Sequence, residues 1–333
     1  MDRQMSLIRS SLIQWIKQGS IAVEHIDEAL NHTQIHPNKA SWLQFIDHLL
    51  LWFGSLAIAI ASIFLVAFNW DDLSRFTHYA LLEVSALVCI IAYCLYHQNR
   101  VVSQVSLIMA ALFIGALLAL VGQTYQTGAD PWQLFFYWAI FITAWAIIAR
   151  SESLWVIWLI LLNTSIITYQ NTFGMPFGSS LPSEITAFLD HQQQFVFVLF
   201  VFNTLCLFAW ELIAHHVQWK TSDWGVRVPA IASGVAITEL TQFGIFDGGS
   251  AFFVCLWLVW AVVFLFSYRK LRPDLFMLAG ANLSIIVVIT SFMANLLIEL
   301  ESLDGLLLLA LTVIGLGAAS AIWLKKVHME MKS

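Results

Sequence analysis

Charged residues are scarce in this sequence. Only 11% of its 333 residues are Asp, Glu, Lys or Arg, and 60% are hydrophobic. Soluble domains carry about 25% charged residues and about 45–50% apolar ones. This composition excludes a water-soluble fold, because the polar side chains are too few to cover the apolar ones. The lipid bilayer is therefore the expected solvent and the first predicted partner of the chain.

Cysteine spacing and sequence motifs of soluble enzymes are also lacking. The four cysteines (Cys89, Cys94, Cys206 and Cys255) lie in apolar runs without a CxxC pair, so no metal or redox site is predicted. The chain has no P-loop, nucleophile elbow, zinc-protease motif or dinucleotide glycine pattern. We therefore predict no cofactor and no nucleic-acid partner. An enzyme that acts within the membrane through scattered residues stays open.

Long apolar runs take the place of these motifs. A helix of about 20 residues, rising 1.5 Å per residue, crosses the hydrocarbon core of a bilayer. The runs predict an all-α polytopic transmembrane bundle of about ten spans over residues 47–324. The predicted spans are 47–69, 77–96, 102–122, 133–149, 154–170, 194–213, 228–246, 251–267, 275–296 and 305–324.

The distribution of basic residues predicts the orientation. With ten spans and a cytoplasmic N-terminus, the outer side holds only Arg75 of the 15 Lys and Arg residues. Cytoplasmic loops are the ones enriched in Lys and Arg, so both termini are predicted to be cytoplasmic, with residues 325–333 as a short basic tail. The outer loops are then acidic. They either attract cations or simply reflect the exclusion of basic residues from that side.

Residues 1–46 form the one substantial hydrophilic segment. Apolar residues recur in it at three- and four-residue spacing from Leu7 to Ile16, which predicts a helix that Gly19 terminates. A second short helix is expected at about residues 22–30. This amphipathic hairpin is too small to fold alone. We expect it to dock on the cytoplasmic ends of the bundle or on headgroups, or to contact a protein partner or a second copy.

Acidic residues within the spans are the sharpest functional clue, because a charge there costs at least about 2.5–3.5 kcal/mol. Glu239 is expected near the middle of its span, with Thr238 and Gln242 beside it. Glu83 lies in the second span, and Glu211 lies near the cytoplasmic end of the sixth. The candidate ion or proton site therefore comprises Glu239, Glu83, Gln242 and Thr238. The alternative is a permanently protonated acid that is hydrogen-bonded to a neighbouring helix.

The connection between the third and fourth spans is more polar than a turn requires. Its candidate functional residues are Gln123, Tyr125, Asp130 and Trp132. A broken helix end with free backbone groups would place an ion or substrate site at the membrane surface. The alternative is a capped turn, with Asp130 as the N-cap and Pro131 at the first helical position.

Three parts of the sequence resemble one family. They are the stretch from Gln123 to Trp132, the triplet Asn69-Trp70-Asp71, and the turn through Gly19. All three are similar to the bacterial predicted membrane proteins grouped as domain of unknown function 2157, most densely over about residues 10–170. The resemblance implies a location in the bacterial cytoplasmic membrane. It supplies no catalytic residues, because the family has no established activity.

Three functions remain as hypotheses. Ion-coupled or facilitative transport predicts a cavity that reaches Glu239. A non-catalytic scaffold, or an envelope-assembly partner, predicts a solid core with an exposed docking patch. An intramembrane enzyme acting on lipid predicts a lateral opening beside clustered polar residues.

Overall fold

A computed structural model describes most of the chain. The described residues are 11–16, 18–25, 28–29, 39–68, 74–125, 128–174, 190–216, 223–246, 251–299 and 305–332. Every regular element in them is a helix, and ten helices are long and apolar enough to cross a membrane. The predicted all-α fold and the predicted number of spans are therefore confirmed.

In the first unit, which comprises residues 1–117, the first described element is a helical segment at residues 11–16. Gly19 has φ +71°, and Ser20 N donates to Trp15 O at 3.0 Å while Gly19 N donates to Ile16 O at 3.1 Å. These two bonds form a Schellman motif, which needs a left-handed residue at this position. The predicted end of the first helix at Gly19 is thus confirmed. The 3₁₀ helix η1 (Val23–His25) follows.

Three long helices begin in the first unit: α3 (Lys39–Phe68), α4 (Arg75–Leu95) and α5 (Arg100–Tyr125). The starts of α4 and α5 follow from local capping. At the start of α4, the Ser74 hydroxyl accepts a hydrogen bond from the backbone N–H of Thr77. At the start of α5, the Asn99 side-chain oxygen accepts hydrogen bonds from the backbone N–H groups of Val101 and Val102. The second unit begins at Leu118, within α5.

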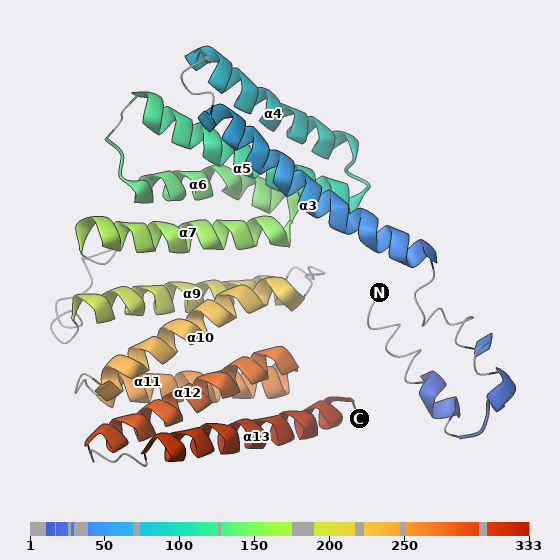
Figure 1. Cartoon of the computed structure of the whole chain (residues 1–333), viewed down its shortest axis with the longest axis vertical. Helices are drawn as coiled ribbons and strands as arrows, with labels where there is room; N and C mark the ends of the chain where they lie inside the picture. The colour runs from blue at the N-terminus through green and yellow to red at the C-terminus, as the bar shows by residue number, and fades with distance from the viewer. Residues whose placement is uncertain are drawn as a thin grey trace. The chain divides into compact units, whose positions relative to one another are not determined.

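The second unit, residues 118–333, contains the remaining helices in a layered series (Figure 1). They are α6 (Pro131–Ala149), α7 (Glu152–Phe173), α9 (His191–His216), α10 (Asp223–Phe246), α11 (Ala251–Phe266), the π-helix η2 (Ser267–Leu271), α12 (Leu275–Glu299) and α13 (Gly305–Lys332). Helix α6 packs on α7, and α12 packs on α13.

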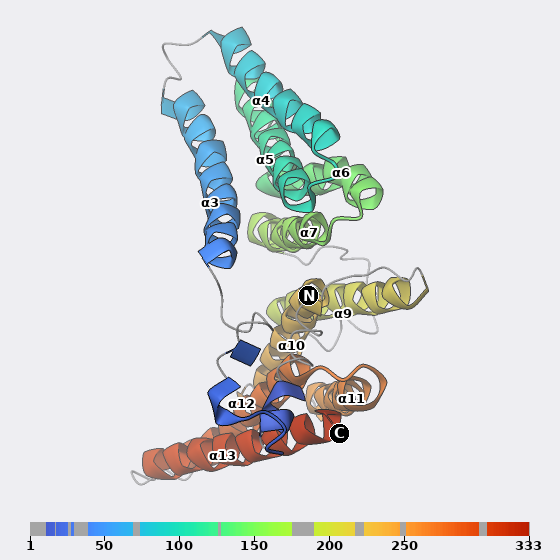
Figure 2. The same cartoon turned by 90° about the vertical axis from the view of Figure 1, so that its right-hand side faces the viewer.

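Helix α10 holds the second unit together. It contacts α7, α9, α11 and α12, and Figure 2 shows it running from beside α9 down toward α11 and α12. Ile237 and Leu240 of α10 are fully buried, as is Leu278 of α12. The main hydrophobic core of this unit therefore lies around α10.

Two helices extend beyond their predicted spans. Helix α3 begins at Lys39 rather than at residue 47, and α13 continues to Lys332 rather than ending at 324. Neither extension contains a Gly or Pro that would stop it. Val327 is buried in the core of the second unit, so an apolar stripe continues through the charged tail. The packing of Val327 in this core accounts for the additional turns of α13.

Some sequence features lie outside the described residues. They include Asn69-Trp70-Asp71, Gln126-Thr127, residues 175–189 of the long outer loop, and the acidic residues Asp247, Glu301 and Asp304.

Candidate functional site

One face of α10 lines a groove in the second unit. Val235, Thr238, Glu239 and Gln242 follow the spacing i, i+3, i+4 and i+7, which places them on the same side of a helix. The groove has a volume of about 680 Å³. Three of the four residues of the predicted ion or proton site, Thr238, Glu239 and Gln242, therefore share one concave surface.

The walls of this groove, formed with α11 and α12, are apolar. Trp260 and Phe264 contribute from α11, and Phe276 and Leu283 contribute from α12. Small residues make the space: an added Cβ at Gly280 of α12 would meet no atom within 4 Å. Phe276 and Leu283 are 47% and 63% exposed, so the groove is open along its side.

Thr238 is held within a hydrogen-bonded group of three side chains. Its hydroxyl donates to Gly234 O and lies 2.6 Å from the Ser284 hydroxyl of α12. The Trp257 indole of α11 donates to the same Ser284 oxygen at 3.0 Å. Thr238 thus joins α10 to α12 at the floor of the groove. Ser284 and Trp257 were not predicted, because a lone Ser or Trp in an apolar run carries no signal of its partner.

Glu239 and Gln242 differ from Thr238 in their surroundings. The Glu239 side chain is exposed to the groove and has no hydrogen-bond or ion-pair partner among the residues that the structure describes. The side-chain oxygen of Gln242 is buried and, within the same part of the chain, equally without a donor. Glu239 and Gln242 therefore both line the groove, and each has an acceptor oxygen without a donor in the described part of the chain. Such an arrangement suits a proton, a cation or a hydrogen-bond donor.

Glu239 also lies away from the end of its span. The span runs from Trp224 to Phe246, which places Glu239 seven residues, or roughly 10 Å at 1.5 Å per residue, from the Phe246 end. Glu239 was predicted to lie near the middle of its span. It lies somewhat nearer to the Phe246 end, because α10 begins at Asp223 rather than at the expected residue 228.

The other two acids occupy different settings. Glu83 belongs to α4 of the first unit, next to the buried stripe of His78, Leu82, Ala86 and Cys89, and is itself exposed. Glu211 of α9 forms an ion pair with Arg272 and accepts a hydrogen bond from Tyr268 Oη at 3.0 Å. These contacts give Glu211 a structural role.

The residues of the polar connection between α5 and α6 are divided between two helices. Gln123 and Tyr125 are exposed in the last turn of α5. Asp130 is the N-cap residue of α6 with Pro131 at the first helical position, although its side chain makes no capping bond. Trp132 packs edge-on against Tyr169 of α7, with ring centroids 5.3 Å apart. The geometry at Asp130 and Pro131 is that of the predicted helix start.

Comparison with known proteins bears on the first half of the chain. Residues 13–155 match the family described as Predicted membrane protein (DUF2157). The match confirms the resemblance expected from the sequence. It ends at the start of α7, so the groove around Glu239 lies beyond the matched residues. No curated protein and no solved structure matches the chain.

Proposed function

We propose that the protein carries out ion-coupled or facilitative transport, with the groove of α10, α11 and α12 as the substrate site. Glu239 binds a proton or the cationic group of an amphipathic substrate there. The observation that carries the proposal is that Glu239 and Gln242, whose acceptor oxygens have no donor among the described residues, line a groove with mostly apolar walls.

The chemistry of the groove supports this substrate class. An ionised carboxylate within a membrane costs at least about 2.5–3.5 kcal/mol, so Glu239 is stable there as a protonated acid or beside a cation. The apolar walls accept the apolar part of an amphipathic molecule. The volume of about 680 Å³ falls within the range of about 300–1,000 Å³ that is usual for small-molecule sites.

Difference infrared spectroscopy on the reconstituted protein tests the role of Glu239. We expect a carboxyl band that responds to a change of buffer, disappears in Glu239→Gln and persists in Glu83→Gln. A band that does not respond would make Glu239 a structural acid without access to water. The scaffold hypothesis would then take precedence.

A steric plug tests whether the groove itself is the route. Gly280→Leu adds a side chain where an added Cβ meets no atom within 4 Å, so it should fill the groove without disturbing the packing. We expect it to reduce proton flux in liposomes loaded with a pH-sensitive dye. The matched control is Gly315→Leu in α13, which also has open space at its Cβ and lies outside the groove. Equal flux in the two variants would refute a route through the groove.

The proposal includes the membrane and the topology. We place the protein in the bacterial cytoplasmic membrane with both termini in the cytoplasm, as the excess of Lys and Arg on one side of the ten spans supports. A fluorescent protein that folds only in the cytoplasm, fused after Ser333, should be bright. A periplasmic phosphatase at the same position should be inactive. The reverse pattern would invert the topology.

A further inference from the structure

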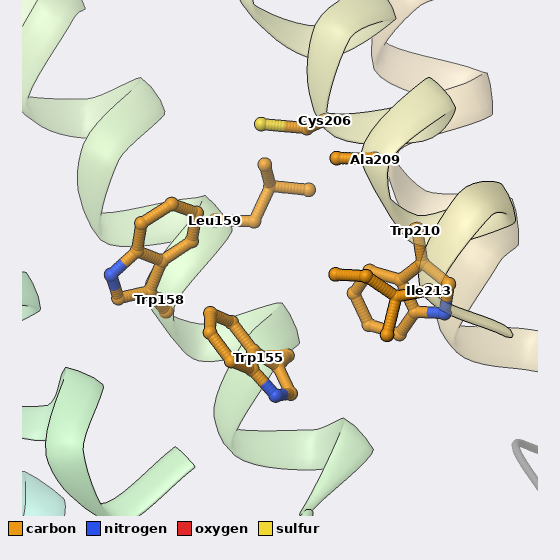
Figure 3. Close-up of a pocket in the computed structure, with 7 residues that line it drawn as sticks. All are labelled: Trp155, Trp158, Leu159, Cys206, Ala209, Trp210 and Ile213. Carbon is orange, nitrogen blue, oxygen red and sulfur yellow. The ribbon is translucent and has the colours of Figure 1, made fainter. Parts of the chain in front are cut away.

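A second pocket lies between α7 and α9 and is lined chiefly by indole rings (Figure 3). Trp155 and Trp158 come from α7, and Trp210 comes from α9 together with Cys206 and Ile213. The pocket has a volume of about 160 Å³. It is separate from the groove around Glu239 and shares no residue with it.

The three rings are held in place by different contacts. Trp155 and Trp158 pack edge to face, with centroids 5.4 Å apart and planes at 77°. The Trp158 indole donates to Thr143 of α6 at 2.9 Å, so its N–H points away from the pocket. Trp210 packs so closely on Gly225 of α10 that an added Cβ there would lie 2.7 Å from its ring. The pocket walls are therefore preorganised.

The pocket lies toward one end of the two spans that line it. Trp155 is the fourth residue of the span that begins at Glu152, roughly 5 Å along the helix at 1.5 Å per residue. On the other side, Ile213 is the last residue of the span that begins at His191. Ile213 is also 44% exposed, which leaves the pocket accessible from outside.

The carboxyl group of Glu152 lies close to the Trp210 ring. Glu152 is only 7% exposed, and its Oε2 lies 3.5 Å from the same point above Gly225 that the Trp210 ring approaches. Indole faces carry negative potential and attract cations, and a neighbouring carboxyl group strengthens this preference. The pocket is therefore complementary to positive charge, although its lining is apolar.

We propose that the pocket formed by Trp155, Trp158 and Trp210 binds an alkylammonium group. Aromatic cages recognise such groups because the cation lies against several ring faces while its methyl groups fill an apolar space. The size agrees, since a cavity of about 150 Å³ holds a benzene ring, whose bulk is close to that of a trimethylammonium group. The ligand is either the headgroup of a lipid or a free alkylammonium compound.

Nuclear magnetic resonance on the full-length protein in dodecyl maltoside tests the proposal. The probes are choline and its uncharged isostere 3,3-dimethylbutan-1-ol, each of which gives one sharp nine-proton signal. We expect the wild-type protein to broaden the choline signal and to bind the isostere about tenfold more weakly, as a partly desolvated cation–π contact implies. Equal binding of the two probes would overturn the proposal without any variant.

Variants locate the binding. Trp210→Leu removes one ring, Glu152→Gln removes the acidic group at nearly constant volume, and Ala209→Leu fills the pocket from α9. We expect each to weaken choline binding about fivefold or more. Trp42→Leu, which removes an exposed indole of α3, is the control and should have no effect. Unchanged binding in all three pocket variants would overturn the assignment.

Lipid nanodiscs distinguish the two sources of the ligand. If the pocket binds headgroups, choline binding should be lost in phosphatidylcholine discs and retained in phosphatidylglycerol discs with the same acyl chains. If it binds a free compound, choline binding should persist in both. Because these measurements do not involve Glu239, they remain independent of the transport proposal.

Discussion

The reciprocal amide pair between α7 and α9 yields a quantitative prediction. Asn163 Nδ2 donates to Asn203 Oδ1 at 3.1 Å, and Asn203 Nδ2 donates to Asn163 Oδ1 at 2.7 Å. Each Nδ2 also donates to a carbonyl oxygen four residues earlier in its own helix, at 2.9 Å. Both amide protons of each side chain are thus used, and Asn203 is only 1% exposed.

The perturbation is Asn203→Leu, Asn163→Leu and the double variant. Interhelical hydrogen bonds in membrane proteins contribute about 0.6 kcal/mol on average, so losing two costs about 1.2 kcal/mol. In each single variant, the Asn that remains also keeps polar atoms that now face the introduced Leu side chain. We therefore expect each single variant to lower the free energy of unfolding by about 1–2 kcal/mol. The double variant should be little worse than either single one, because no orphaned amide remains.

Reversible unfolding in mixed micelles of dodecyl maltoside and sodium dodecyl sulfate measures these free energies. Thr164→Val is the control on the same helix, because the Thr164 hydroxyl donates to Ile160 O of its own helix and to no other helix among the described residues. We expect a change below about 0.5 kcal/mol for it. If the effects of the two Asn substitutions add to within about 0.3 kcal/mol, the pair is not coupled and the reasoning fails.

Two further contacts give predictions for the same unfolding assay. Gly225→Ala should destabilise the protein by about 1–3 kcal/mol, because its Cβ would lie 2.7 Å from the Trp210 ring, whereas Gly315→Ala should be neutral or stabilising. A stable Gly225→Ala variant would show that this ring can move. Arg227→Met should lower the free energy of unfolding more than Arg269→Met does. The ion pair of Arg227 with Asp274 is the more buried of the two, whereas the pair of Arg269 with Glu330 is about half exposed. Equal costs would contradict that ranking.

Local sequence signals were sufficient for most of the fold. Each span is a long apolar run, and the bilayer requires such runs to be helical. The helix end at Gly19 and the helix start at Asp130-Pro131 also depend on neighbouring residues only, and the structure has both where the sequence places them. The additional turns of α13 were missed, because they depend on the burial of Val327 against other helices.

The surroundings of the candidate site depended on information that a single sequence lacks. Spacing along α10 was enough to group Thr238, Glu239 and Gln242. The pairing of Thr238 with Ser284 required knowing that α12 packs on α10. The indole pocket likewise required α7 to lie beside α9. Which helices are neighbours is decided by packing across the whole unit, and no short pattern records it.

The ion pairs at one end of the second unit set an order of events during synthesis. Glu211 is made 61 residues before Arg272, and Arg227 is made 47 residues before Asp274. Both early side chains therefore leave the ribosome before their counter-ions have been made. The pairs close only when η2 and the start of α12 emerge. A chain stalled before residue 272 would carry α9 and α10 with neither pair closed.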